Sequence, residues 1–360
     1  MTFGGAEVLV HDFLRANRDR AAQTIVCLDA VGPLGEGLRA DGVRVELLHR
    51  REGFQPRIAV ALNALVREIR PDVVCAHQYT PYSYAAMAIG PMRHRPGLVF
   101  VEHGRHYPDV RRPKRVLANR VAFLPVTRRV VAVCGYIKRL LVENEGIPAS
   151  RIDVIHNGVD PSRFDPALAQ PDVRAELGIP AGAPVVTCVA RFHPVKDHPT
   201  LLRAFAATSA AVPDARLLLV GGGDAAPLRS LAAELGVAER VVFAGVRRDI
   251  PAVYAASDLF AMASLSEGTS VTLLEAMLSR RATVVTDVGG NPEIVLRGRS
   301  GLLVPRGDAS AMGAALVSLL RDPERRAAMG DAGRARVLDG FTQARMHAGW
   351  LATLQDASAP

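Results

Sequence analysis

The sequence predicts an α/β protein built from two doubly wound, Rossmann-like domains that face each other across a cleft. Short apolar, β-branched runs alternate with helical stretches along all 360 residues, which is the pattern of βαβ units and a parallel sheet. That length fits two domains of about 150 residues each. A stretch dense in Asn, Asp, Gly and Pro, residues 157–184, separates the two halves.

In the first half, runs rich in Val, Ile and Leu predict strands at residues 24–28, 43–47, 72–76, 98–102, 129–133 and 152–155. Apolar residues at helical spacing predict helices at 6–16, 58–70 and 136–144. The helix at 6–16 follows Gly4 and Gly5 directly, with no strand before it. Because a doubly wound domain normally opens on a central strand, we expect a first strand of about ten residues to be missing from this sequence.

In the second half, the same alternation predicts strands at 184–190, 215–220, 241–244, 259–262, 283–286 and 301–304, and helices at 199–211, 225–235, 271–279 and 310–321. We expect the domains to span 1–163 and 164–340, with a last helical segment, 341–360, packing back towards the first domain. In open α/β sheets, ligands bind outside the carboxyl ends of the strands, so the cleft is the expected site.

Composition excludes several classes of protein. With 49% hydrophobic and 22% charged residues the chain is not disordered, and 5% aromatics argue against a single-strand nucleic-acid binder. No apolar run approaches the roughly 20 residues that span a bilayer. The cysteines (Cys27, Cys75, Cys134 and Cys188) form no C-x-x-C pair, which predicts buried thiols in a cytoplasmic protein.

Positive charge is concentrated in the first half. Of the net +8, residues 1–165 carry +7, and a basic stretch lies at Arg111, Arg112, Lys114, Arg115 and Arg120. This indicates either an anionic surface or substrate, or a solvated face in an arginine-rich protein. If the stretch is functional, we expect a peripheral position at the inner face of the plasma membrane.

The first candidate site segment is 191–196, directly after a predicted strand. Arg191 and Lys196 would lie at the strand end, where they could hold a diphosphate through charge-assisted hydrogen bonds. Lysine is rare in this chain, with Lys114, Lys138 and Lys196 the only three, which favours a specific role. The alternative is a pair of surface cations on a loop.

The second segment, 267–275, holds two glutamates eight positions apart. The amides of Gly268, Thr269, Ser270 and Val271 open a predicted helix, which is an arrangement that binds anions. Glu275 could accept the two hydroxyls of a ribose. Helix capping explains Glu267 and Ser270 equally well.

Three weaker signals remain. Gly5, in Gly4-Gly5-Ala6-Glu7, permits close backbone approach to a ligand, as do the glycines of 221–224. His103 follows a strand and would face the cleft.

The chain lacks G-x-G-x-x-G, a P-loop, G-x-S-x-G and any D-x-D. These absences disfavour a dehydrogenase, a P-loop enzyme, a serine hydrolase and a metal-held sugar nucleotide, respectively.

Taken together and in order, these motifs resemble retaining glycosyltransferases of family 4, which have the GT-B fold. The matching stretches are GGAE (4–7), VEHG (101–104), VIHNGVDPSRFDP (154–166), VARFHPVKDHPTLLRAF (189–205), EGTSVTLLEAM (267–277) and TDVGGNPEIV (286–295). The sequence departs from the family where a glycine and a proline usually follow the helix, because Arg280 and Ala282 stand there. The difference concerns the turn after that helix more than the site.

The resemblance implies a role for each site residue. Arg191 and Lys196 would neutralise the donor diphosphate, Glu275 would bind the ribose, and Glu267 and His103 would lie beside the transferred sugar. Gly5 would lie near the donor phosphates.

The resemblance also implies a reaction. A sugar would pass from a nucleoside diphosphate sugar to a saccharide or lipid-linked acceptor in cell-surface polysaccharide or glycolipid synthesis, with its configuration retained and with no metal or other cofactor. Nucleic acid is not expected as a partner. Two alternatives stay open, a sugar-nucleotide epimerase of the same fold and a non-catalytic protein that binds nucleotide sugars or glycans.

Overall fold

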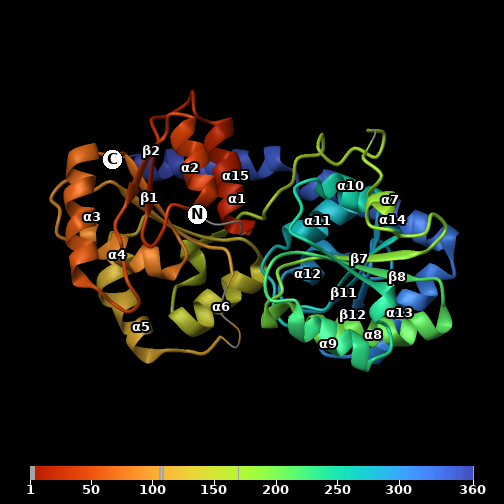
Figure 1. Cartoon of the computed structure of the whole chain (residues 1–360). Coiled ribbons are helices and arrows are strands. Elements are labelled where there is room, and N and C mark those ends of the chain that lie inside the picture. The colour runs from red at the N-terminus through yellow and green to blue at the C-terminus, as the bar shows by residue number, and fades with distance from the viewer. Residues whose placement is uncertain (1–4, 105–106, 108, 169, 360) are drawn as a thin grey trace. The chain divides into compact units, whose positions relative to one another are not determined.

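The chain forms two compact units. The computed structural model describes residues 5–104, 107, 109–168 and 170–359 (Figure 1). The first unit contains residues 1–156 and 347–360, and the second contains residues 157–346. Segment 157–163 belongs to the second unit because Val159 N donates to the Phe341 carbonyl oxygen (3.0 Å), and Gln343 N donates to the Val159 carbonyl oxygen (2.8 Å).

The first unit alternates strands and helices as the sequence predicts. Its strands are β1 (Thr24–Cys27), β2 (Arg44–Leu47), β3 (Val73–His77), β4 (Gly97–Glu102), β5 (Arg129–Ala132) and β6 (Ile152–Val154). Its helices are α1 (Gly5–Ala16), α2 (Gly32–Ala40), α3 (Pro56–Ile69), α4 (Tyr79–Ile89), α5 (Pro113–Ala118), α6 (Gly135–Glu145) and, from His347 onward, α15 (Gln343–Ser358). Short helical turns cover Asn119–Phe123, Leu124–Val126 and Ala149–Arg151.

The parallel strands of the first unit fall into two separate sheets. One contains β1 and β2, and the other has the order β3-β4-β5-β6. β4 is buried along its whole length, and its Leu98 and Phe100 pack in a core with residues of α3, α4 and α6. Three of the four residues of β1 are only half-buried.

The second unit has one continuous six-stranded sheet. Its strands are β7 (Val185–Val189), β8 (Arg216–Val220), β9 (Val241–Gly245), β10 (Leu259–Met262), β11 (Ala282–Thr286) and β12 (Leu302–Val304). Its helices are α7 (Val173–Glu176), α8 (His198–Ala211), α9 (Ala226–Glu234), α10 (Ile250–Ala255), α11 (Val271–Leu278), α12 (Asn291–Ile294), α13 (Ala309–Leu320) and α14 (Pro323–Gly340). Short helical turns cover Pro194–Lys196 and Ala238–Arg240.

The strand order in this sheet is β12-β11-β10-β7-β8-β9, all parallel. The first strand of the unit, β7, therefore lies at the centre. In the first unit, β1 pairs with β2 and β3 pairs with β4, and no described strand joins the two sheets.

Two cores cover the two faces of the second sheet. On β7, Val186 and Cys188 face α8, α9 and α13, whereas Val185 and Val189 face α10, α11 and α14 (Figure 1). Because both faces of the central strands are buried, β7, β8 and β10 are largely apolar, which is why the sequence showed them clearly.

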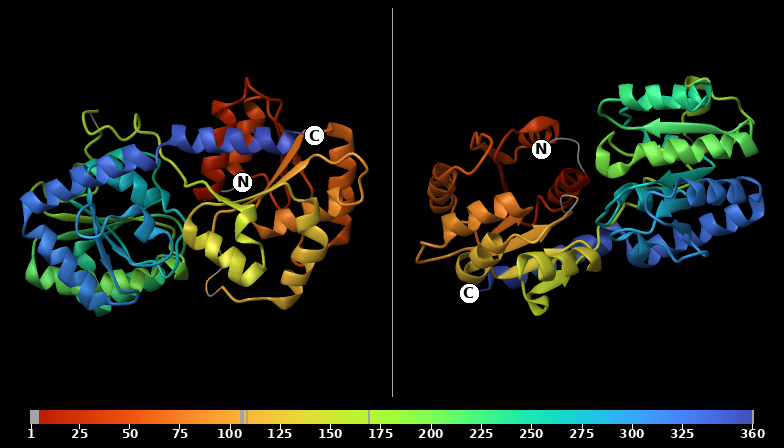
Figure 2. Two further views of the ribbon diagram at one scale, coloured as in Figure 1. Left: turned by 180° about the vertical axis from the view of Figure 1, so that it is seen from behind. Right: turned by 90° about the horizontal axis from the view of Figure 1, so that it is seen from below.

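The last helix completes the first unit. Figure 2 shows the C-terminal part of α15 lying along that unit. Arg129 Nε is 2.5 Å from Asp356 Oδ2, and the ring of Trp350 lies 6.1 Å from that of His77. The predicted α/β class with two Rossmann-like units is confirmed.

Candidate functional site

The centre of the candidate site in the second unit is an ion pair between Lys196 and Glu267. Lys196 ends the helical turn after β7, and Glu267 lies in the loop between β10 and α11. Lys196 Nζ donates to Glu267 Oε1 at 2.5 Å. Their side chains are 20% and 8% exposed, so the pair is largely shielded from water. The two loops are joined further by Leu265 N, which donates to the Val195 carbonyl oxygen (2.8 Å).

Glu267 is held through one oxygen only. Ser264 Oγ also donates to Oε1, at 2.5 Å. Among the residues that the structure describes, none donates a hydrogen bond to Oε2. One carboxylate oxygen is therefore fixed by two donors, while the other retains its capacity to accept hydrogen bonds from a ligand. Sequence reasoning missed Ser264, and no motif pointed to it.

The backbone of Glu267 rests on the glycine turn after β11. Gly290 N donates to the Glu267 carbonyl oxygen (3.2 Å). A Cβ on Gly289 would lie 2.0 Å from that oxygen, and the φ of Gly289 is +58°. Only glycine tolerates both this close approach and a positive φ, so the turn 286–290 packs against the backbone of Glu267 and holds it in place.

Arg191 lies at the end of β7, as predicted, and its residue is exposed. Within the described part of the chain, its guanidinium has no hydrogen-bond or ion-pair partner. The loop that carries Arg191 is held by backbone contacts with the glycines that follow β8. Phe192 N donates to the Gly222 carbonyl oxygen (2.7 Å), and a Cβ on Gly221 would lie 2.0 Å from the Ala190 carbonyl oxygen. The glycines of 221–224 therefore pack against the Arg191 loop.

The amino terminus of α11 lies next to Glu267 in the chain. Ser270 caps the helix, because its Oγ accepts from Leu273 N (3.4 Å), and Asn157 Nδ2 donates to the Thr269 carbonyl oxygen (2.9 Å). The capping interpretation of Ser270 is confirmed, but it leaves the amides of Gly268 to Val271 oriented with the positive end of the helix dipole.

Glu275 lies on the second turn of α11 and is half-buried. Its charge acts on Tyr254. Burial raises the pKa of Tyr254 well above its usual value, and the negative charge of Glu275 raises it further. A neutral histidine lies near the ion pair, because burial and the charge of Lys196 lower the pKa of His198 to about 4.

In the first unit, His103 directly follows β4, at the carboxyl edge of its sheet, as predicted. Gly5 is the first residue of α1 and is exposed. A Cβ there would meet nothing within 4 Å, so no described part of the protein requires a glycine at this position. Gly4 lies outside the described residues.

The predicted basic surface requires a correction at Arg115. Arg115 Nη1 is 3.1 Å from Glu145 Oε1, whose side chain is only 1% exposed, and its guanidinium lies 3.5 Å from the ring centre of Tyr79. Arg115 is therefore a structural residue, since it neutralises a buried carboxylate. Its neighbours Arg111, Arg112 and Lys114 are exposed.

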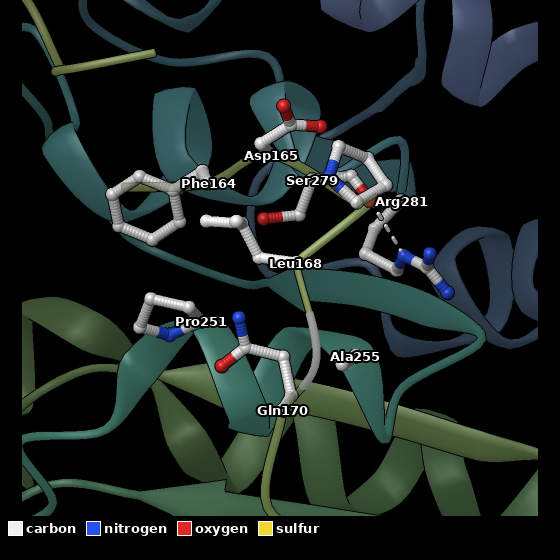
Figure 3. A pocket seen from close by; sticks show the side chains of 9 residues that line it. Phe164, Asp165, Leu168, Gln170, Pro251, Ala255, Ser279 and Arg281 are labelled. Carbon is white, nitrogen blue, oxygen red and sulfur yellow. Dashed lines mark hydrogen bonds between the residues drawn. The ribbon is translucent and has the colours of Figure 1, made fainter. Parts of the chain in front are cut away.

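A separate pocket lies under the segment that follows Phe164. It has a volume of about 180 Å³ and is lined by Phe164, Asp165, Pro166, Leu168, Gln170, Pro251, Ala255, Ser279 and Arg281 (Figure 3). Arg281 Nε closes one side by donating to the Ser279 carbonyl oxygen (2.8 Å). None of the predicted site residues lines it. No group of three or more potential metal ligands (His, Cys, Asp, Glu) gathers within the described ranges.

Two family models match the chain in sequence. Residues 3–163 match Glycosyltransferase Family 4, and residues 183–322 match Glycosyl transferases group 1. A GDP-mannose-dependent alpha-(1-6)-phosphatidylinositol monomannoside mannosyltransferase of Mycolicibacterium smegmatis is 33% identical over 308 residues, which are 80% of this chain and 77% of the relative. A D-inositol 3-phosphate glycosyltransferase of Nocardia farcinica is 37% identical over 56% of this chain, and the match spans about half (47%) of that relative.

Solved structures show the same fold. Anabaena HepE, in complex with UDP and glucose, superposes with a TM-score of 0.82 and 26% identity over 98% of this chain and 96% of its own. A glycosyltransferase from Rickettsia africae superposes with a TM-score of 0.86 over 99% of this chain and 97% of its own, at 19% identity. The second likeness concerns the fold alone.

Proposed function

Because the chain belongs to glycosyltransferase family 4, we propose that it moves a sugar from a nucleoside diphosphate sugar to a hydroxyl of a saccharide or lipid-linked acceptor, with retention of configuration and without a metal. Membership makes it a transferase of the GT-B fold, so the epimerase and the non-catalytic protein are not retained. The relatives named above include a GDP-mannose-dependent enzyme and a protein crystallised with UDP and glucose. Both support a nucleotide sugar donor, but they differ in base.

The observation that supports this proposal best is the Lys196–Glu267 pair beside the start of α11. As the glycosidic bond breaks, negative charge develops on the leaving diphosphate. Arg191, Lys196 and the amides at Gly268–Ser270 would stabilise that charge in a site from which water is excluded. These cations and dipoles supply the neutralisation that a metal ion provides in other sites, and the sequence has no D-x-D.

Glu267 would orient the sugar. Its Oε1 stays with Lys196 and Ser264, and its Oε2 would accept a hydrogen bond from a sugar hydroxyl. We do not assign it as a nucleophile. In the proposed reaction the acceptor attacks from the face that the diphosphate leaves, and the leaving phosphate oxygen takes the acceptor proton.

Replacement of Lys196 tests the role of the cation. Lys196→Ala should lower kcat/KM by about 10²-fold, the loss typical of a removed transition-state charge partner. Arg203→Ala is the matched control, since Arg203 is an exposed cation of the same unit that lies outside the candidate site. Equal rates for the two variants would refute the proposed role.

Two further measurements test the rest of the proposal. Donor depletion across UDP-, GDP- and ADP-sugars identifies the base, and NMR of the glycosidic product determines its anomeric configuration. An inverted product would refute retention. Loss of activity after chelator treatment, restored by a divalent cation, would refute metal independence.

The acceptor side of the proposal rests on the segment 110–121. Exposed arginines and a lysine alternate there with apolar side chains, because Val110, Leu117 and Val121 are 58%, 63% and 67% exposed. This mixture suits an anionic lipid surface that carries a lipid-linked acceptor. No helix of the described residues has both the length and the apolar character needed to cross a bilayer.

Vesicle binding tests the surface. Replacing Arg111, Arg112 and Lys114 by Gln should reduce co-sedimentation with anionic vesicles by about 10-fold or more, at about 1 kcal/mol for each cation near the surface. The matched control removes the same charge elsewhere in the unit, at the exposed Arg20, Arg51 and Arg93. Equal loss in both triple variants would refute a specific surface.

A further inference from the structure

Two histidines meet at the carboxyl edge of the four-stranded sheet in the first unit. His77 is the last residue of β3 and pairs in register with Val101 of β4, while His103 follows the end of β4. His77 Nδ1 and His103 Nε2 are 2.8 Å apart, which is hydrogen-bond distance. Nothing in the sequence pattern had singled out His77.

Both rings are neutral at pH 7. Burial lowers the pKa of His77 to about 4, and burial together with the neighbouring His77 lowers the pKa of His103 to about 3. A neutral imidazole carries one N–H and one lone pair. In a bond between two such rings, one nitrogen donates and the other accepts, so the tautomer of one ring fixes the tautomer of the other.

The corner that carries His77 is tied to the segment that carries His103. Gln78 has a φ of +73°, and its backbone N donates to the Val101 carbonyl oxygen (2.7 Å). With the side-chain nitrogen of Gln78 turned towards Glu102, it donates to Oε1 (2.7 Å) and to the Gly104 carbonyl oxygen (3.2 Å). The two histidines are therefore held at a fixed separation.

The second ring nitrogen of His103, Nδ1, is buried. None of the described residues forms a hydrogen bond with it. A buried ring nitrogen left unsatisfied costs free energy that a ligand hydroxyl can recover.

We propose that His77 is a positioning residue for sugar transfer, because its Nδ1 holds His103 Nε2 and so presents His103 Nδ1, in one tautomer, to a hydroxyl of the transferred sugar. The inference rests on the proposed function for the place of the sugar, but the pairing of the rings does not depend on it. His77 itself would touch no substrate.

Two substitutions separate this role from simple packing. The amide of Asn can reproduce a hydrogen bond from Nδ1 of histidine, whereas the amide of Gln matches Nε2. His77→Asn should therefore keep kcat/KM for the donor within about 3-fold, while His77→Gln and His77→Ala should lose about 10-fold or more. His94→Ala, at an exposed histidine of the same unit, should have no effect.

A readout without turnover completes the test. In full-length protein labelled with ¹⁵N-histidine, His103 should show one tautomer at pH 7 in the wild type and in His77→Asn, and exchange between tautomers in His77→Gln and His77→Ala. Unchanged His103 signals in all variants would overturn the proposal, as would a changed tautomer with unchanged kcat/KM in His77→Gln. If no donor is ever transferred, the proposed function fails, but the NMR result still decides the pairing.

Discussion

Gly289→Ala is expected to separate the support of Glu267 from general backbone strain. A Cβ at this position lies 2.0 Å from the Glu267 carbonyl oxygen, about 1.4 Å short of ordinary contact, and that oxygen belongs to backbone that cannot rotate away. Either the turn 286–290 or the loop carrying Glu267 must move. Because Glu267 and Lys196 share a bond of 2.5 Å, a displacement on the order of 1 Å breaks their alignment.

The expected magnitude has two parts. Alanine at a φ of +58° costs about 1–2 kcal/mol, and the steric overlap adds about 1–3 kcal/mol. A misplacement of about 1 Å in a catalytic group is expected to lower kcat/KM by about 10²-fold. Thermal unfolding measures the first effect, and initial rates of donor consumption measure the second.

Gly298→Ala is the matched control. Gly298 also has a positive φ, +73°, but a Cβ there meets nothing within 4 Å. Gly298→Ala should therefore lose only the stability that alanine costs at a positive φ, and it should retain its activity. If both variants lose stability and activity equally, or if Gly289→Ala stays fully active, the glycine turn does not support Glu267.

Three other predictions follow from contacts described above. Arg280 has a φ of +57° after α11, so Arg280→Gly should raise the free energy of unfolding by about 0.5–1 kcal/mol in urea titrations, despite losing an exposed ion pair. Arg115→Met leaves the carboxylate of Glu145 buried without its cation and should lower the free energy of unfolding by about 3 kcal/mol. The lowered pKa values of His77 and His103 mean that the unfolded chain binds more protons than the folded one, so stability is full above pH 6.5 and falls as pH drops towards 4.

Controls keep these three predictions specific. Arg299→Gly, at an exposed arginine outside the positive-φ region, should destabilise or leave stability unchanged, and a gain there equal to that of Arg280→Gly would contradict the strain argument. Arg112→Met should change the free energy of unfolding by less than about 0.5 kcal/mol. In unfolding measured at pH 7 and pH 5, His77→Asn should lose less stability than the wild type, and an identical loss would contradict the assignment.

Much of the fold was predictable because its central strands are buried on both faces. Every predicted strand segment forms a strand, since runs such as 259–262 are apolar throughout. Helices without a polar face were harder to predict. In α4, Tyr82, Tyr84 and Ile89 are all fully buried, so no helical periodicity separates a wet face from a dry one.

The candidate site also contains residues that the sequence predicted and residues that it did not. Arg191, Lys196 and Glu267 stand next to strand ends and glycines, and that local pattern singled them out. The partners of Glu267 could not be predicted, because Ser264 and Gly289 reach it through loops whose course no short-range pattern specifies. Likewise, the sequence could not distinguish Arg115 from its exposed neighbours, because its partner Glu145 lies far away in the chain.

The discontinuous first unit has a consequence for the order in which the protein is made. Its last piece, residues 347–360, leaves the ribosome after the whole of the second unit. Arg129, on β5, therefore cannot form its ion pair with Asp356 until then, and the ring of His77 cannot contact Trp350. Domains usually fold in the order of their synthesis. Here the later unit is complete first, and the strand residues that contact α15, among them His77, Gly97 and Arg129, lack that helix until the second unit has been made.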